Sequence, residues 1–205
     1  MDQPNRKRNM NILTKILTSL FNRKKPVPLS PPYPANKTVS GAIEEQKKSN
    51  FSEAYRPTPN VSPKPIKPRL VILHHTCGNY AGSVSWCLNP ASRVSYHCII
   101  AEDGRRTVLA TPDKRTWHAG LANWKGKKDI NSISVGLAFE KDTYSKPLTE
   151  EQMYSALEYL KPILKKDNIA FDNILDHRMI SPRRKDDLNP IEYHRLKKFL
   201  LLHIP

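Results

Sequence analysis

The stretch Val71-Ile72-Leu73-His74-His75-Thr76 decides how the rest of the chain can be interpreted. Its apolar residues predict a short buried strand, and that strand ends in two imidazoles. Catalytic and metal-binding side chains are usually displayed where the strands of an α/β sheet end. Partners for one of these histidines lie far downstream, at His177 and at the neighbouring residues Lys185, Asp186 and Asp187. We therefore expect a functional site at the end of this strand.

The composition divides the 205 residues into a basic N-terminal part and a domain. Residues 1–69 hold 11 of the 18 prolines and carry 14 Lys or Arg against 4 Asp or Glu. Residues 70–205 are numerous enough to bury one core without disulfide bonds. We predict a basic amphipathic segment over 1–25, a disordered proline-rich linker over 26–69 and a single domain over 70–205.

Apolar residues recur at helical spacing from Ile12 to Phe21, between two clusters of basic residues. This pattern is typical of a short amphipathic helix on an anionic membrane surface, which residues 10–25 would contact. A helix that packs on the domain has the same pattern. Nucleic-acid binding is a third interpretation, but the segment lacks interleaved aromatic residues, so we expect no specific nucleic-acid partner.

The three cysteines, Cys77, Cys87 and Cys98, do not suggest a disulfide framework, because their number is odd. A Cys77–Cys87 bridge is one alternative, and free buried thiols are the alternative that we favour. No stretch reaches the ~20 apolar residues of a membrane span. The N-terminal apolar segment is not followed by a cleavage site, so we expect no signal peptide and synthesis in a cytoplasm.

The order of the predicted elements indicates an α/β fold, with a single mixed β-sheet flanked by helices. The expected strands are 70–75, 94–101, 107–110, 133–139 and 174–177. The expected helices are 83–88, one that follows a capping box at Thr149, and one that follows Asn189 as its cap. Two strands therefore end in histidine, and two imidazoles with one carboxylate are a ligand set of catalytic zinc sites. Residue types alone make this a weak signal for metal.

Five motifs between residues 70 and 200 resemble one family in content and in order. They are Ile72-Leu73-His74-His75-Thr76, Val94-Ser95-Tyr96-His97, Trp117-His118-Ala119-Gly120, Ser134-Val135-Gly136-Leu137, and His177 with Pro182, Arg184, Lys185 and Asp187. The chain resembles the zinc-dependent type-2 N-acetylmuramoyl-L-alanine amidases, which include phage endolysins, muropeptide-recycling amidases and the peptidoglycan recognition proteins. The resemblance implies that the domain binds Zn²⁺ and acts on peptidoglycan.

The residues that the resemblance carries over are the zinc ligands His74, His177 and Asp187, and the catalytic residue Lys185. The Pro-Gly that usually follows the aspartate in the family is replaced by Leu188-Asn189 here. Asp186 therefore stays open as an alternative third ligand. Cys77 could also bind zinc as a thiolate, although we expect it to be a buried structural residue.

The glutamate that serves many members of the family as general base aligns with Ala138 in this chain. Glu140 lies two residues further along, on the same face of the strand. Tyr96 matches a tyrosine that phage members place near the metal, so we expect Tyr96 to assist catalysis, with Glu140 as the weaker candidate. The resemblance also implies that His118 and Trp117 line the substrate groove. His75 and His97 are assigned no catalytic role.

The resemblance implies hydrolysis of the amide bond between the lactyl group of N-acetylmuramic acid and L-alanine, by a water that zinc activates. We expect a monomeric, bacteriolytic phage endolysin that is kept in the host cytoplasm until its release and then degrades the periplasmic cell wall. A non-catalytic peptidoglycan-binding module and a muropeptide-recycling amidase are the alternatives. The complete ligand set disfavours the first alternative, and the N-terminal arm disfavours the second.

Overall fold

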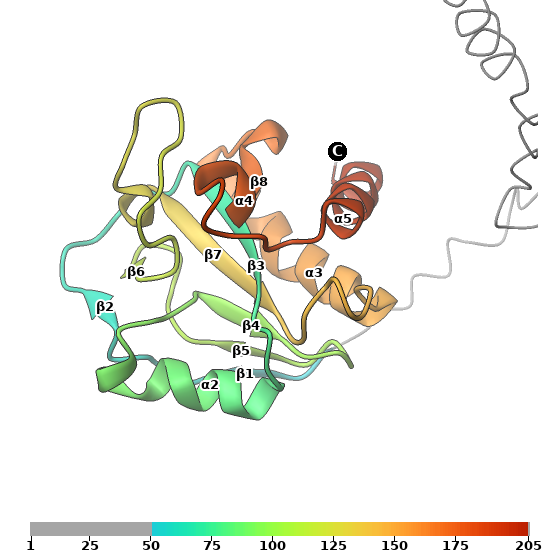
Figure 1. Ribbon diagram of the computed structural model, residues 1–205, viewed down its shortest axis with the longest axis horizontal. Helices are drawn as coiled ribbons and strands as arrows, with labels where there is room; N and C mark the ends of the chain where they lie inside the picture. The colour runs from blue at the N-terminus through green and yellow to red at the C-terminus, as the bar shows by residue number, and fades with distance from the viewer. Residues whose placement is uncertain (1–50, 205) are drawn as a thin grey trace, which may run out of the picture. The chain divides into compact units, whose positions relative to one another are not determined.

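The computed structural model describes residues 51–204, which fold around a six-stranded mixed sheet with the strand order β1-β5-β4-β7-β3-β8 (Figure 1). Its strands are β1 (Glu53–Tyr55), β3 (Leu70–His75), β4 (Cys98–Ile100), β5 (Arg106–Val108), β7 (Ser134–Phe139) and β8 (Ile174–Asp176). A separate antiparallel pair joins β2 (Val61–Ser62) to β6 (Arg115–Thr116). The prediction of one mixed sheet in an α/β domain is confirmed.

Parallel pairing in the centre of the sheet brings the functional strand ends together. Strand β3 lies between β7 and β8 and is parallel to both, and β4 is parallel to β7. The carboxyl ends of these four strands therefore meet at one edge of the sheet. Because side chains alternate along a strand, His74 projects from the same face as Ile72, whereas His75 projects from the face that carries Leu73.

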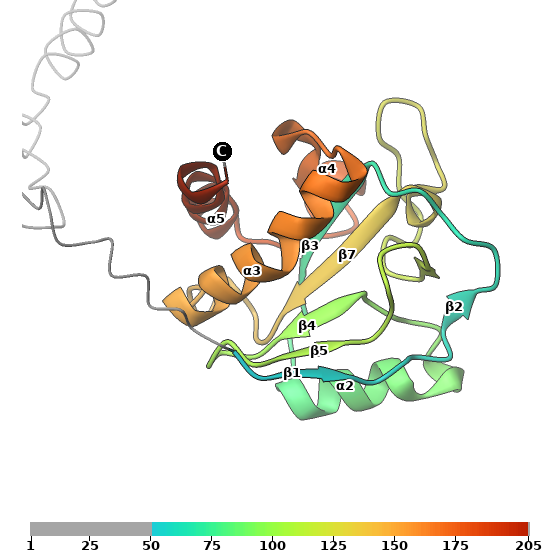
Figure 2. The same ribbon diagram turned by 180° about the vertical axis from the view of Figure 1, so that it is seen from behind.

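Helices cover both faces of the sheet (Figures 1 and 2). The helices are α2 (Tyr80–Leu88), α3 (Glu150–Asp167), α4 (His177–Ile180) and α5 (Pro190–His203), with 3₁₀ turns η1 (Pro90–Ser92), η2 (Ile130–Ser132) and η3 (Phe171–Asn173). Helices α3 and α5 bury their apolar residues against the face of Leu73. Helix α2 packs on the opposite face through Val84 and Cys87. No helix among residues 51–204 is long and apolar enough to cross a bilayer.

The helix caps show where the sequence pattern predicted the boundaries well. Thr149 begins α3 with the predicted capping box, and Asn189 caps α5. The predicted start of α2 is wrong, because Asn79 accepts the Gly82 N–H and so begins this helix earlier. Strand β8 also ends earlier than predicted, since Asp176 caps α4 and leaves His177 as the first residue of that helix.

Residues 51–69 belong to the domain, so the predicted linker is wrong for this part of the chain. Strand β1 pairs with β5 at the edge of the sheet. The buried amide of Asn60 donates to the carbonyl groups of Cys87, Asn89 and Val94 at 2.9–3.1 Å. The density of prolines concealed this segment, because prolines between short edge strands resemble the composition of a linker. The predicted segment 1–25 and the linker up to residue 50 lie outside the described residues.

The cysteines are free, as we favoured. Cys87 and Cys98 are buried, but Cys77 is exposed, which corrects its predicted buried position. It follows the end of β3 directly and adopts a left-handed backbone conformation, with φ of 55°.

His97 is a structural histidine that joins β4 to its neighbours. Its Nδ1 accepts the Gly136 N–H at 2.9 Å, and its Nε2 donates to the carbonyl of Lys114 at 2.9 Å. Burial lowers the pKa of His97 from 6.5 to about 4. The neutral ring is therefore part of the folded state.

Replacement of Asn60 by alanine should lower the free energy of unfolding by about 1–3 kcal/mol, because three carbonyl groups lose a buried donor. Urea denaturation of the full chain measures this change. An unchanged unfolding midpoint would show that residues 51–69 are only a tether.

The His97→Asn variant should be less destabilised at pH 4.5 than at pH 7.5. The pKa of His97 is lower in the folded state than in the unfolded state, so the wild type loses stability as the pH falls from 6.5 toward about 4. Asparagine keeps the acceptor for Gly136 but does not titrate, so the difference between the two proteins should shrink by roughly 2 kcal/mol. Urea denaturation at both pH values, with a chelator present, measures it. An equal difference at both pH values would contradict the assignment.

Candidate metal centre

Three acceptor atoms from separate segments converge at the carboxyl edge of the sheet. His74 Nδ1 lies 3.0 Å from His177 Nδ1 and 3.0 Å from Asp187 Oδ2. His177 Nδ1 lies 3.2 Å from the same carboxylate oxygen. All three side chains are buried. The structure therefore brings together the three residues predicted as ligands, in a nearly equilateral triangle of two nitrogens and one oxygen.

Each of the three residues is held by a different part of the fold. His74 stands at the end of the central strand β3. His177 opens α4, which the buried carboxylate of Asp176 caps by accepting the Met179 N–H at 3.0 Å. The Asp187 carbonyl accepts the Arg178 N–H at 3.1 Å, which ties the loop after α4 back to that helix.

The ionisation of the three residues suits a cation at the centre of the triangle. Burial and the nearby His177 lower the pKa of His74 to about 4, so its ring is neutral at pH 7. Asp187 contributes a carboxylate oxygen to the same triangle. His177 Nε2 donates to the carbonyl of Ala119 at 3.0 Å, so its Nδ1 presents a lone pair.

The triangle has the size that a tetrahedral metal ion requires. Zinc binds imidazole nitrogen and carboxylate oxygen at about 2.0–2.1 Å, which places adjacent ligands about 3.3 Å apart. The observed separations are 3.0, 3.0 and 3.2 Å. Two imidazoles and one carboxylate leave a fourth position for water, as in catalytic zinc sites.

Two alternative ligands lie outside this triangle. Asp186 is exposed, and its backbone carbonyl accepts the hydroxyl of Tyr144 at 3.1 Å. Cys77 lines the neighbouring cavity, and burial together with Asp142 raises the pKa of its thiol. Within residues 51–204, the group able to hold a metal consists of His74, His177 and Asp187. The geometry therefore favours Asp187 as the third ligand.

A cavity of about 530 Å³ opens above the triangle. Lys185 lines it with an exposed side chain, and Trp117 lines it with a half-buried one. The ring of Tyr96 lies 5.1 Å from the ring of His74, measured between centroids. Burial and the charge of Asp187 raise the pKa of Tyr96 well above its usual value, so its hydroxyl stays protonated at neutral pH.

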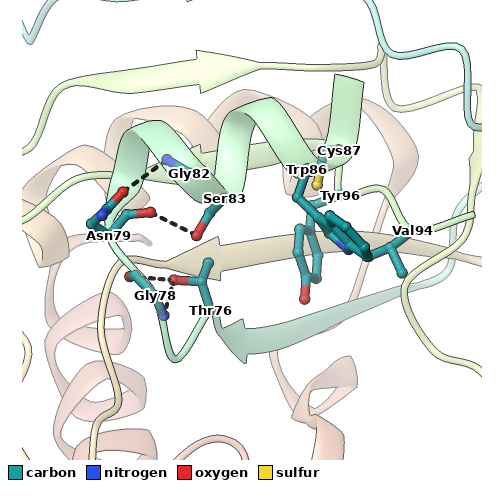
Figure 3. A pocket seen from close by; sticks show the side chains of 9 residues that line it. All are labelled: Thr76, Gly78, Asn79, Gly82, Ser83, Trp86, Cys87, Val94 and Tyr96. Atoms are coloured by element: carbon teal, nitrogen blue, oxygen red, sulfur yellow. Dashed lines mark hydrogen bonds between the residues drawn. The ribbon is translucent and has the colours of Figure 1, made fainter. Parts of the chain in front are cut away.

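A second cavity of about 390 Å³ adjoins the first and shares Tyr96 with it. Figure 3 shows Trp86, Val94 and Tyr96 at one end of this cavity, and Asn79 and Ser83 at the other. The residues that line it carry no formal charge. The two cavities together suit an extended ligand with chemically different ends.

Glu140 does not line either cavity. One oxygen of its carboxylate accepts the Tyr80 N–H at 2.9 Å, and the other accepts the Glu102 N–H at 3.0 Å. Both oxygens are thus used to join β7 to the start of α2 and to the turn after β4. The interpretation of Glu140 as a catalytic residue is not supported by this position.

The predicted groove residues Trp117 and His118 occupy different environments. The indole of Trp117 donates to Ser62 Oγ at 3.2 Å and exposes part of its ring to the cavity. His118 is buried, and its two ring nitrogens face His74 and Ser134. Both residues line the cavity, but Trp117 is half-buried with its ring open to a ligand, whereas both ring nitrogens of the buried His118 already contact protein side chains.

Two contributors to the site could not be recognised from residue types. The Ala119 carbonyl orients His177, and Asn131 Oδ1 accepts the N–H groups of His118 and Ala119 at 3.2 and 2.8 Å. A backbone carbonyl has no sequence signature. The Trp117-His118-Ala119-Gly120 motif was the available signal, but it suggested contact with substrate instead.

The chain is similar in sequence and in fold to known amidases. The 1,6-anhydro-N-acetylmuramyl-L-alanine amidase AmpD of Haemophilus influenzae is 36% identical over 109 residues, which cover 53% of this chain and 58% of that relative. The chain spans about half the length of the curated relatives it matches.

Two solved structures share the fold at low identity. The Escherichia coli amidase AmiD, solved in complex with the substrate anhydro-N-acetylmuramic acid-L-Ala-D-gamma-Glu-L-Lys, has a TM-score of 0.56 at 22% identity and covers 65% of this chain and 57% of its own. A mutant endolysin from Bacillus subtilis has a TM-score of 0.59 at 18% identity and covers 73% and 99% of the two chains. The family profile described as N-acetylmuramoyl-L-alanine amidase matches residues 64–190, which is more than half of the chain, and the protein therefore belongs to this family.

Proposed function

We propose that the chain is a zinc-dependent hydrolase that cleaves the amide bond between the lactyl group of N-acetylmuramic acid and L-alanine. The observation that carries the proposal is the triangle of His74, His177 and Asp187 at the base of an open cavity. A non-catalytic binding module has no need of a complete ligand set. A zinc ion held by this triangle would supply a water of lowered pKa and would polarise the carbonyl of the scissile amide.

The residues around the cavity supply the remaining steps. Attack of water on the carbonyl carbon places negative charge on the carbonyl oxygen, which the ammonium of Lys185 stabilises. The C–N bond then breaks, and the proton that the attacking water gives up passes to the leaving amine of L-alanine, through Tyr96 or a water. Because the pKa of Tyr96 is raised, its hydroxyl acts as a donor of a hydrogen bond or proton and not as a base.

The cavities match the two chemical halves of this substrate class. Arg93, Arg184 and Lys185 line the cavity above the triangle, and cationic side chains suit the carboxylates of a peptide stem. The structural relative AmiD was solved with a muropeptide, which has a sugar on one side of the scissile amide and a peptide on the other. We infer that this chain also binds a muropeptide across its metal centre.

Two candidate functions differ in the form of the substrate, which is either assembled peptidoglycan or soluble fragments of it. The net charge of +15 favours association with a large anionic polymer, so we propose that the chain acts on assembled peptidoglycan as a phage endolysin, on the periplasmic side of the host envelope. The similarity to the Haemophilus influenzae AmpD favours the second candidate, a muropeptide-recycling amidase that acts on soluble fragments.

The Asp187→Ala variant should lose bound zinc and should cleave the amide more than about 100-fold more slowly. Loss of a metal ligand should lower activity more than loss of a residue that only hydrogen-bonds to a ligand. Asp186→Ala is the matched control, since its carboxylate is exposed and adjacent in sequence. Elemental analysis measures zinc, and release of L-alanine-terminated peptides from murein measures cleavage. Equal zinc content and activity in wild type and Asp187→Ala would exclude the proposal, and zinc-free protein that binds murein without cleaving it would favour a recognition module.

Digestion of purified sacculi by the full chain should proceed at low salt and should slow as salt is added, because screening weakens attraction between the basic protein and the anionic polymer. The matched assay uses a soluble 1,6-anhydro-muropeptide under the same conditions. Cleavage of sacculi supports the endolysin proposal. Cleavage of the soluble muropeptide alone would contradict it and identify a recycling amidase.

A further inference from the structure

The second ring nitrogen of His74 faces a buried chain of hydrogen bonds. His74 Nε2 lies 3.0 Å from His118 Nδ1. On the other side of the ring, His118 Nε2 lies 3.2 Å from Ser134 Oγ. Ser134 Oγ lies 2.6 Å from the carbonyl oxygen of Ile130, which is the last group in this series of hydrogen bonds. All four residues are buried, so water does not compete for these contacts.

The carbonyl group of Ile130 determines the position of every proton in this series of hydrogen bonds. A carbonyl oxygen can only accept, so the single hydroxyl proton of Ser134 points at Ile130. Ser134 must then accept from His118, which places the proton of that ring on Nε2 and leaves a lone pair on Nδ1. The lone pair accepts from His74 Nε2–H. The neutral ring of His74 therefore has no proton on Nδ1, the atom that faces the metal centre.

We propose that His118 is a positioning residue that holds His74 in the one tautomer able to bind the metal. The inference rests on the proposed function, because it takes the triangle to be a metal centre. In this role His118 does not bind the metal itself, although its ring borders the cavity. Its contribution is to select between two tautomers of His74 and to fix the orientation of the ring before the metal binds.

Neighbouring residues fix the position of the His118 ring. A Cβ atom at position 136 would lie 2.5 Å from Cγ of His118, so Gly136 provides the space that the imidazole occupies. Asn131 Oδ1 accepts the N–H of His118 and that of Ala119. Ala119 in turn accepts from His177 Nε2. One short loop thus sets the orientation of both metal-binding imidazoles, through a side chain for His74 and a carbonyl for His177.

Zinc affinity of the full chain tests the proposal without any measurement of catalysis. His118→Leu removes the acceptor for His74 and should weaken zinc binding about 10- to 100-fold. His118→Asn places an amide oxygen where Nδ1 was and should stay within about threefold of wild type. Ser134→Ala releases His118 to take either tautomer and should weaken binding by a smaller factor, between about 2 and 10. Competition with a chelator of known affinity measures all three.

The protonation of the rings provides a second readout, which a merely structural role for His118 would not determine. Nitrogen NMR of the zinc-loaded wild type should show the proton of His74 on Nε2 and the proton of His118 on Nε2. A proton on Nδ1 of His118 would overturn the proposal. So would zinc affinity of His118→Leu equal to that of wild type. If zinc binding and tautomers are as expected but murein is not cleaved, the positioning role stands and the proposed function fails.

Discussion

Three acceptor atoms without a proton between them must be held about 3 Å apart inside the protein, and this constraint organises the structure around the sheet edge. Lone pairs in this arrangement repel one another, and a cation bound between them would stabilise it. Each imidazole must also direct its remaining N–H away from the centre, toward an acceptor that cannot move. The fold meets both requirements with rigid elements, because His74 stands on the central strand and His177 begins a capped helix.

The loop between β6 and β7 connects the metal centre to the rest of the domain. Its residues His118 and Ala119 accept from the two ligand imidazoles, while Trp117 faces the cavity. Asn131 accepts the backbone N–H of Ala119 in this loop, and the absence of a side chain at Gly136 leaves room for the ring of His118. Support of the two imidazoles and the lining of the cavity are therefore provided by neighbouring residues of one segment, which explains how a single motif can suggest either role.

Sequence patterns predicted the parts of this site that depend on side-chain type and on strand ends. Apolar residues before His74 and before His177 indicated two buried strands, and parallel pairing brought their ends together. The patterns failed where function depends on backbone groups or on distant packing. The Ala119 carbonyl has no residue signature, and Glu140 could not be assigned to its backbone partners without the turn after β4. Proline content concealed β1, because edge strands require little regular sequence.

We propose that His74, His177 and an aspartate hold a metal ion by two nitrogens and one oxygen. X-ray absorption spectroscopy of the zinc-loaded full chain tests this claim most directly, because it distinguishes nitrogen and oxygen ligands at about 2.0–2.1 Å from sulfur at about 2.3 Å. The proposed coordination predicts one zinc ion per chain, two imidazoles and no sulfur. A sulfur ligand, which the exposed Cys77 would have to supply, or a single imidazole would contradict it.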